Sequence, residues 1–180
     1  KTSDGVISPE NDKLLVRDAD ELIIVFSAAT DYNLSLMNFD RSLDPVAITK
    51  GIVADARKKN WDNLLSAHLK EHTTLFNKVQ FTLGTTEQAD LPTDARIAAI
   101  KQGATDNDLM AQMFQFGRYL LMSSSRAPGK LPANLQGIWS EREWAPWEAD
   151  YHLNVNLQMN YWPADVCHLS ATVDPLVGWF

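Results

Sequence analysis

Side-chain amides are concentrated between residues 134 and 160 of this chain. The six residues are Asn134, Gln136, Asn154, Asn156, Gln158 and Asn160. An amide offers both hydrogen-bond donors and an acceptor, which suits a ligand rich in hydroxyl groups. Asn154 and Asn156 would point to one side of an extended segment, whereas Asn156 and Asn160 would share one face of a helix. The alternative is a structural role, because Asn also caps helices and braces loops.

Tryptophans are concentrated in the same part of the chain. Five of the six lie between residues 139 and 179, at Trp139, Trp144, Trp147, Trp162 and Trp179. Three of these fall in residues 123–150, which are rich in proline and glycine and are predicted to form a long loop. An indole face can stack on the apolar face of a sugar ring. The alternative is that the rings only hold the loop against the rest of the fold.

Acidic residues accompany these amides and rings. They are Glu141, Glu143, Glu148, Asp150 and Asp165. Glycoside hydrolysis commonly uses two carboxyl groups that flank the scissile bond, but most acidic residues in loops are simply solvated. His68 and His72 have the spacing of a helical metal chelate, yet no third ligand lies near them. We therefore expect no metal and no cofactor. The sequence also has no glycine-rich phosphate loop and no serine-hydrolase elbow.

Composition argues against several classes of partner. Lys and Arg total 16 and Asp and Glu total 23, so the net charge of −7 disfavours nucleic acid and anionic membranes. The single cysteine, Cys167, rules out an intrachain disulfide and is expected to be a buried, inert thiol. No apolar run approaches the roughly 20 residues that cross a bilayer, so we expect no membrane insertion. The first five residues do not begin a signal peptide.

Strands are expected near the start of the chain and again before residue 85. Lys13–Val16 and Glu21–Ala28 have β-branched and apolar character, and the alternation of residues 79–83 predicts a short strand that ends at Gly84. Two strands do not make a stable sheet by themselves. We therefore expect the first two to form the edge of a larger β domain.

Helices are expected through most of the remaining sequence. Their predicted ranges are Ile48–Arg57, Asp55–Phe76, Thr93–Lys101, 107–123, Leu153–Trp162, Pro163–Leu169 and Val173–Phe180. Asp106 or Asn107 is the predicted cap of the fourth helix. Apolar residues cover more than one face of that helix, so we expect it to be buried on most sides.

Two long segments resemble one family of enzymes. Residues 123–139 read SSSRAPGKLPANLQGIW, and residues 147–164 read WEADYHLNVNLQMNYWPA. The ordered pair resembles glycoside hydrolase family 95, which includes α-L-fucosidases and α-L-galactosidases. Weaker similarity extends over the rest of the chain, including residues 22–30 and 61–76.

This resemblance implies a mainly α fold. The chain would hold the first helices of an (α/α)6 barrel, preceded by a helical linker and the last strands of an N-terminal β-sandwich. Residues 1–33 would be the end of the sandwich, residues 34–90 the linker and residues 91–180 the N-terminal part of the catalytic barrel. The 180-residue chain is then expected to be an internal fragment that is inactive alone, because half a barrel does not close.

The resemblance also implies a mechanism and a set of site residues. Family members invert configuration: a Glu is the general acid, and an Asp helps a water to attack. Asn154 and Asn156 match the N-x-N motif that positions this water and carboxylate. His152 matches a position at the C6 end of the sugar, where His accompanies fucose and Thr accompanies L-galactose. Trp147 and Asn134 are expected to contact substrate.

The expected function is therefore release of α-L-fucose from fucosylated glycans by an inverting exo-glycoside hydrolase. The alternatives are an α-L-galactosidase of the same family, a non-catalytic carbohydrate-binding module and a helical scaffold with the tryptophans as core. Asp165 and Asp174 lie too close to Asn156 to match the family's catalytic carboxylates, so both carboxylates are expected outside this chain. The substrate class implies a secreted or periplasmic location. The oligomeric state and the linkage preference do not follow from the sequence.

Overall fold

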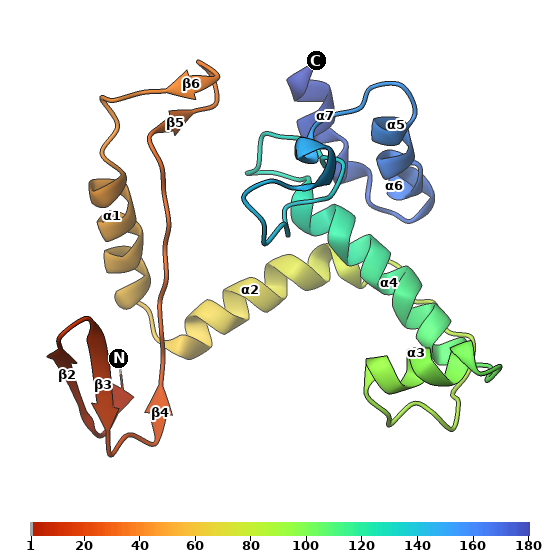
Figure 1. The fold of residues 1–180 in the computed structure, drawn as a ribbon, viewed down its shortest axis with the longest axis horizontal. Helices are drawn as coiled ribbons and strands as arrows, with labels where there is room; N and C mark the ends of the chain where they lie inside the picture. The colour runs from red at the N-terminus through yellow and green to blue at the C-terminus, as the bar shows by residue number, and fades with distance from the viewer. Residues whose placement is uncertain (1) are drawn as a thin grey trace. The chain divides into compact units, whose positions relative to one another are not determined.

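A computed structural model describes residues 2–180, with side chains from residue 4 onward. The fold is mainly helical, with three small antiparallel sheets of two strands each (Figure 1). The chain divides into two compact units, Lys1–Lys70 and Glu71–Phe180. The predicted site residues all belong to the second unit, so the first is described only briefly.

The first unit contains the strands. Its three pairs are β1 (Thr2–Ser3) with β4 (Glu21–Leu22), β2 (Val6–Glu10) with β3 (Lys13–Arg17), and β5 (Tyr32–Asn33) with β6 (Asn38–Phe39). The predicted strand at residues 13–16 is confirmed as β3. The strand predicted at residues 21–28 is wrong beyond Leu22, where no ladder continues. Apolar, β-branched residues favour an extended backbone, but a strand also needs a neighbouring strand to bond with.

Helix α1 (Pro45–Arg57) follows the strands and begins three residues earlier than its periodicity predicts. Its start is set by Asp44, whose Oδ1 accepts from the backbone N–H groups of Val46 and Ala47 at 2.9 and 3.1 Å. Pro45 occupies the first helical position, where its missing N–H costs nothing. An acidic cap followed by proline therefore locates this terminus better than the apolar stripe does.

Helix α2 (Trp61–Phe76) is separate from α1. It begins six residues after Asp55, where the sequence predicted its start. The side chain of Asn60 accepts from the N–H of Asn63 at 2.8 Å and caps the new helix. A cap in the middle of a continuous apolar stripe is what divides the two helices.

The strand predicted before Gly84 is also wrong, because residues 78–86 form no ladder. Instead the Val79 carbonyl accepts from Gln115 Nε2 at 3.0 Å, and the Phe81 ring packs on the Phe114 ring at 4.9 Å. Both partners, Gln115 and Phe114, lie on α4 (Asn107–Ser124). The alternation therefore reflects the packing of an extended segment on a helix rather than membership of a sheet.

Helices α3 (Thr93–Lys101) and α4 (Asn107–Ser124) confirm the predicted ranges, and Asp106 caps α4 through the N–H of Leu109 at 2.9 Å. The expectation that α4 is buried on most sides is wrong. One face is buried, whereas the other carries Met113 at 68% and Phe116 at 58% exposure. The described elements that pack on α4 cover one side only.

Buried Arg118 ties α4 to its neighbours. Its guanidinium donates to the carbonyls of Leu75, Phe76 and Cys167 at 2.9–3.3 Å and stacks over the Phe76 ring. Burial lowers the pKa of Arg118 from its ordinary value. Because the last carbonyls of a helix have no partner within it, this side chain supplies donors to the end of α2.

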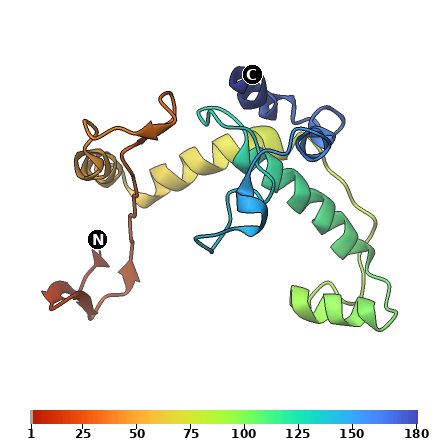
Figure 2. The ribbon, with the colours of Figure 1, turned by 45° about the horizontal axis from the view of Figure 1, so that its top comes forward.

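The remaining elements are short and gather at the C-terminal end of α4 (Figures 1 and 2). They are η1 (Pro146–Ala149), α5 (Asn156–Tyr161), α6 (Pro163–Val166), η2 (Ser170–Thr172) and α7 (Asp174–Trp179). All three helices are shorter than predicted. The buried cluster beneath them consists of Leu121, Met122, Ala133, Ala164 and Leu169. Cys167 is buried, as predicted. Among residues 2–180, no helix has both the length and the apolar character needed to span a bilayer.

Candidate active site

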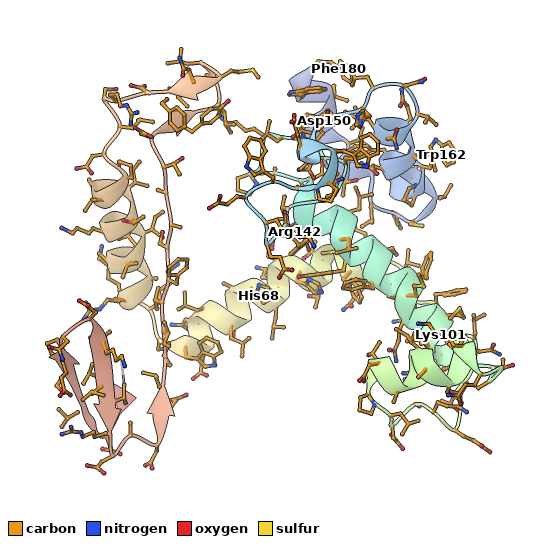
Figure 3. The ribbon with its side chains drawn as sticks, in the orientation of Figure 1. His68, Lys101, Arg142, Asp150, Trp162 and Phe180 are labelled. Atoms are coloured by element: carbon orange, nitrogen blue, oxygen red, sulfur yellow. The ribbon has the colours of Figure 1, made fainter. Side chains whose placement is uncertain are left out.

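Two of the predicted site residues, His152 and Asn156, line one small recess in the second unit. The empty space between its lining residues is about 130 Å³, and none of it is wide enough to hold a water molecule. Asp150, Tyr151 and Asn160 also line it, so a carboxylate, a phenol, an imidazole and two amides meet there. Figure 3 shows Asp150 at the same end of α4 as Trp162 and Phe180, whereas Lys101 lies at the other end. The recess is too narrow to enclose a sugar ring, so a sugar would sit at its mouth.

His152 is held by its neighbours in the loop. Its Nδ1 lies 3.0 Å from Asp150 Oδ1, and the edge of its ring faces the Trp147 indole at a centroid distance of 6.2 Å and an angle of 78°. The carboxylate only accepts, so Nδ1 donates. In the neutral imidazole this arrangement leaves Nε2 as an acceptor for another group.

Asn154 and Asn156 occupy different kinds of backbone. Asn154 is exposed in a turn, whereas Asn156 is the first residue of α5 and lines the recess. The extended arrangement considered for this pair is therefore wrong. Asn156 and Asn160 both line the recess from one helix, which confirms the helical arrangement.

Asn134 reaches the site through the backbone of its loop. Its carbonyl accepts from Asn160 Nδ2 at 3.2 Å. Its side-chain oxygen is buried and has no hydrogen-bond partner in residues 2–180, and the same is true of Gln136 Oε1. Buried polar atoms in folded proteins nearly always have a partner. Neither Asn134 nor Gln136 lines the recess, whereas their neighbours Ala133 and Leu135 do.

The tryptophan loop is mostly exposed. Trp144 and Trp147 have 77% and 74% exposure, so these two rings do not hold the loop against the described part of the chain. Trp139 is partly covered and contacts the Tyr119 ring at 6.4 Å. Three consecutive residues, 147–149, have left-handed backbone with φ of 57°, 56° and 52°. Residues other than glycine adopt this conformation at a cost, and such strain is concentrated at functional sites.

Tyr151 contributes an aromatic side chain to the recess. Its ring lies 4.8 Å from that of Trp179, and its hydroxyl donates to the Pro132 carbonyl at 3.4 Å. Burial raises the pKa of Tyr151, and nearby Tyr161 adds to this effect. Tyr151 is therefore a neutral phenol at ordinary pH.

Of the acidic loop residues considered above, Asp150 lines the recess, whereas Glu141, Glu143 and Glu148 are exposed. No three acidic, His or Cys side chains gather into a possible metal site within residues 2–180. The recess thus offers amides, an imidazole and one carboxylate. At its mouth these groups can bind a hydroxyl-rich ligand, but the recess by itself lacks the second carboxyl group that glycoside hydrolysis uses.

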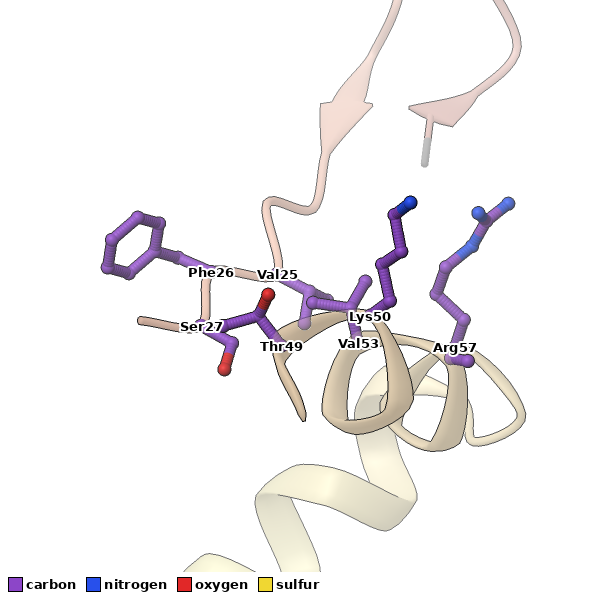
Figure 4. A pocket seen from close by; sticks show the side chains of 8 residues that line it. Val25, Phe26, Ser27, Thr49, Lys50, Val53 and Arg57 are labelled. Atoms are coloured by element: carbon purple, nitrogen blue, oxygen red, sulfur yellow. The ribbon is translucent and has the colours of Figure 1, made fainter. Parts of the chain in front are cut away.

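A larger groove lies in the first unit, between residues 25–27 and α1 (Figure 4). The empty space between its lining residues is about 710 Å³, against about 130 Å³ for the recess, and Thr49, Lys50 and Arg57 contribute its polar side chains together with Ser27. It is open and contains no carboxylate, imidazole or amide side chain. We assign the candidate site to the smaller recess because the groups with acid, base and amide chemistry meet there.

Two residues near the site, Ser125 and Tyr161, were not identified as site residues from the sequence. The Tyr161 hydroxyl lies 2.7 Å from Ser125 Oγ and accepts from the Ala133 N–H at 2.7 Å. These partners are 36 and 28 residues away in the chain. No local pattern indicates such pairs. The only signal in the sequence is that Tyr161 directly follows the amide cluster.

Comparison with known proteins places the chain among glycosidases. The family described as "Glycosyl hydrolase family 95 catalytic domain" matches residues 60–180. The chain is 37% identical over 181 residues to "Probable alpha-fucosidase A" of Aspergillus niger, covering 97% of this chain and 22% of that protein. It is 36% identical over 175 residues to "Alpha-L-fucosidase 2" of Arabidopsis thaliana, covering 93% and 20%. The chain thus spans about a fifth of the length of these relatives.

Proposed function

This chain belongs to glycosyl hydrolase family 95, and on that premise we propose that it forms part of the active site of an inverting exo-hydrolase that releases α-L-fucose from fucosylated glycans. The observation that carries the proposal is the recess in which His152, Asn156 and Asn160 meet. The names of the two relatives described above support fucose as the sugar.

In this proposal Asn154 and Asn156 hold the attacking water and the carboxylate that activates it. An amide oxygen accepts a hydrogen bond from the water without removing its proton, and an amide NH₂ donates to the carboxylate. Inversion needs a gap of roughly 6.5–9.5 Å between the two carboxyl groups to leave room for the water. The general acid and the Asp come from residues outside this chain.

The sugar itself would contact His152, Trp147 and Asn134. Asp150 fixes Nδ1 of His152, so Nε2 is available to the ligand. The Trp147 indole beside this imidazole offers an apolar surface to the C6 methyl group of fucose. L-Galactose has a hydroxyl at that carbon, and an indole face offers it no hydrogen-bond acceptor. The Trp147 ring therefore favours fucose.

The first test is hydrolysis of nitrophenyl α-L-fucoside and α-L-galactoside by the full-length protein. We expect faster hydrolysis of the fucoside, and proton NMR during the reaction should detect β-L-fucose as the first product. Release of the α-anomer would exclude inversion, and a preference for the galactoside would exclude our assignment of the sugar.

The second test changes the amides. Asn154→Ala and Asn156→Ala should each lower kcat by about 10²- to 10³-fold, the usual effect of removing a polar group that acts in the transition state. Asn77→Ala is the matched control, because Asn77 is an exposed amide just after α2. Near-normal turnover in both site variants would show that the assigned roles are wrong.

The third test addresses the sugar. His152→Thr should lower kcat/KM for the fucoside and raise the relative rate on the galactoside, with a combined change of about 10-fold or more. An unchanged ratio would remove His152 from the determinants of specificity. We also propose that the full-length protein acts outside the cytoplasm, where fucosylated glycans are met, and cell fractionation with the same assay tests this location.

A further inference from the structure

The loop at residues 132–137 is anchored through several of its backbone groups, whereas two of its side-chain oxygens have no partner in the described residues. The N–H of Ala133 donates to Tyr161, the N–H of Leu135 donates to the Asp150 carbonyl at 3.1 Å, and the carbonyls of Ala133 and Asn134 accept from Asn160. The side-chain oxygens at positions 134 and 136 have no partner in the described residues. The position of this loop is therefore set by hydrogen bonds of its main chain.

The Tyr161 hydroxyl belongs to a one-way chain of hydrogen bonds. Ser125 Oγ donates to the Thr172 carbonyl at 2.8 Å, and a carbonyl only accepts, so the single hydroxyl proton of Ser125 is used there. Tyr161 must therefore donate to Ser125, and its oxygen accepts the Ala133 N–H. Ser125 and Thr172 have no exposed surface. Donation thus runs from Ala133 through Tyr161 and Ser125 to Thr172.

Asn160 and Tyr161 are adjacent at the end of the short helix that begins with Asn156. One end of α5 therefore lines the recess through Asn156, and the other end holds the loop of Asn134. Since α5 spans only six residues, displacement of its last turn relative to the loop changes the placement of both amides.

We propose that Tyr161 is a positioning residue of this active site, whose hydroxyl fixes the loop of Asn134 against α5 and so sets the placement of Asn134 relative to Asn156. The inference rests on the proposed function, because it assigns the consequence of this hydroxyl to turnover. Removing the hydroxyl leaves the Ala133 N–H without its acceptor in a buried position, so the loop must move to find another.

The kinetic test uses the full-length protein. Tyr161→Phe keeps the ring and removes the hydroxyl, and Ser125→Ala breaks the chain at a residue that has no bond to the loop. Each should lower fucoside kcat by about 10- to 100-fold with a smaller change in KM, as expected when supporting groups are lost and reacting groups are displaced. The double variant should lose little more than either single variant, because one chain is broken in both.

Tyr32→Phe is the matched control, because Tyr32 belongs to the first unit and its side chain has only a ring contact with Phe39. It should leave kcat unchanged. A kcat for Tyr161→Phe within about threefold of the wild type would overturn the proposal, because it falls far short of the loss that displaced groups cause. If Tyr161→Phe does not fold, Ser125→Ala breaks the same chain of hydrogen bonds, and its kcat decides in the same way.

Amide hydrogen exchange separates this inference from the proposed function. Exchange at residues 133–137 should be faster in Tyr161→Phe and Ser125→Ala than in the wild type, and unchanged in Tyr32→Phe. A wild type without fucosidase activity but with this exchange pattern would refute the proposed function and leave the anchoring of the loop supported. Unchanged exchange in both variants would refute the role of Tyr161, whatever the substrate.

Discussion

The two ends of α4 are anchored by different chemistry. At the N-terminal end, the Asp106 carboxylate accepts from Thr86, from the backbone of Leu109 and twice from buried Arg96 at 2.7–2.9 Å. At the C-terminal end, neutral hydroxyls join Ser125 to Tyr161. A buried charge shifts the pKa of nearby acids and bases more strongly than a neutral hydroxyl does. A buried ion pair therefore anchors the helix at the end opposite the candidate site.

The substitution Arg96→Met tests whether the buried ion pair anchors the N-terminal end of α4. It leaves the carboxylates of Asp106 and Asp108 facing one another without a cation, and unpaired buried charge is strongly destabilising. We expect the largest loss in the series, a fall in melting temperature on the order of 10 °C by calorimetry of the full-length protein. Lys58→Met, at an exposed ion pair, is the control and should have almost no effect. Equal shifts in the two variants would show that the buried pair does not anchor α4.

Met122→Ala tests the C-terminal end of α4. Met122 has no exposed surface and belongs to the cluster beneath the recess, so the cavity should cost about 2–5 kcal/mol in the free energy of unfolding. Met113→Ala, on the exposed face of the same helix, should change it by less than about 0.5 kcal/mol. Denaturant melts would measure both. Similar values would mean that apolar packing does not distinguish the two faces of α4.

Lowering the pH should destabilise the N-terminal end of α4 more than its C-terminal end. Hydrogen bonds from Arg96 hold the pKa of Asp106 well below its usual range, although burial alone would raise it. An unfolded Asp titrates at about 3.9, so this stabilisation is complete above about pH 4 and is lost as the pH falls further. Hydrogen exchange at pH 5 and pH 3, corrected for intrinsic rates, should show protection falling at residues 107–112 but not at residues 121–126. The reverse order would contradict the comparison.

The smallest effect is expected at Glu71. Its carboxylate pairs with Arg126 near the neutral end of α4, but about half of the Glu71 side chain is exposed. Glu71→Gln should therefore cost at most about 1 kcal/mol in thermal or denaturant melts. A larger loss would show that charge contributes to anchoring this end as well.

The sequence predicted α3 and the Asp106 cap of α4, but the caps Asp44 and Asn60 that begin α1 and α2 were missed. The range of α3 and the Asp106 cap of α4 follow from residues within a few positions of each other. The prediction of a strand before Gly84 was wrong because the alternation of its side chains fits a strand equally well. Only the contact of Val79 with Gln115 identifies the segment as packing on α4. Periodicity shows that side chains alternate, but it does not show what they contact.

Some residues of the candidate site could likewise be predicted from the sequence, and others could not. His152 and Asn156 were predicted from a resemblance and do line one recess, and their assigned roles stay predictions. The contributions of Asp150 to His152 and of Tyr161 to the loop depend on backbone turns that bring the partners together. Left-handed backbone at residues 147–149 is the least predictable of these features, because no glycine marks it.

The six-residue length of α5 has a consequence for the order in which this unit assembles during synthesis. Isolated helices shorter than about 12–15 residues are marginal in water, so α5 depends on its anchors. Tyr161 follows Ala133 by 28 residues, so at roughly 5–20 residues per second it leaves the ribosome about 1–6 s later. The partners of Asp106 lie within 20 residues of it. The charged end of α4 can therefore form on the nascent chain before the recess does, and the candidate site is completed later.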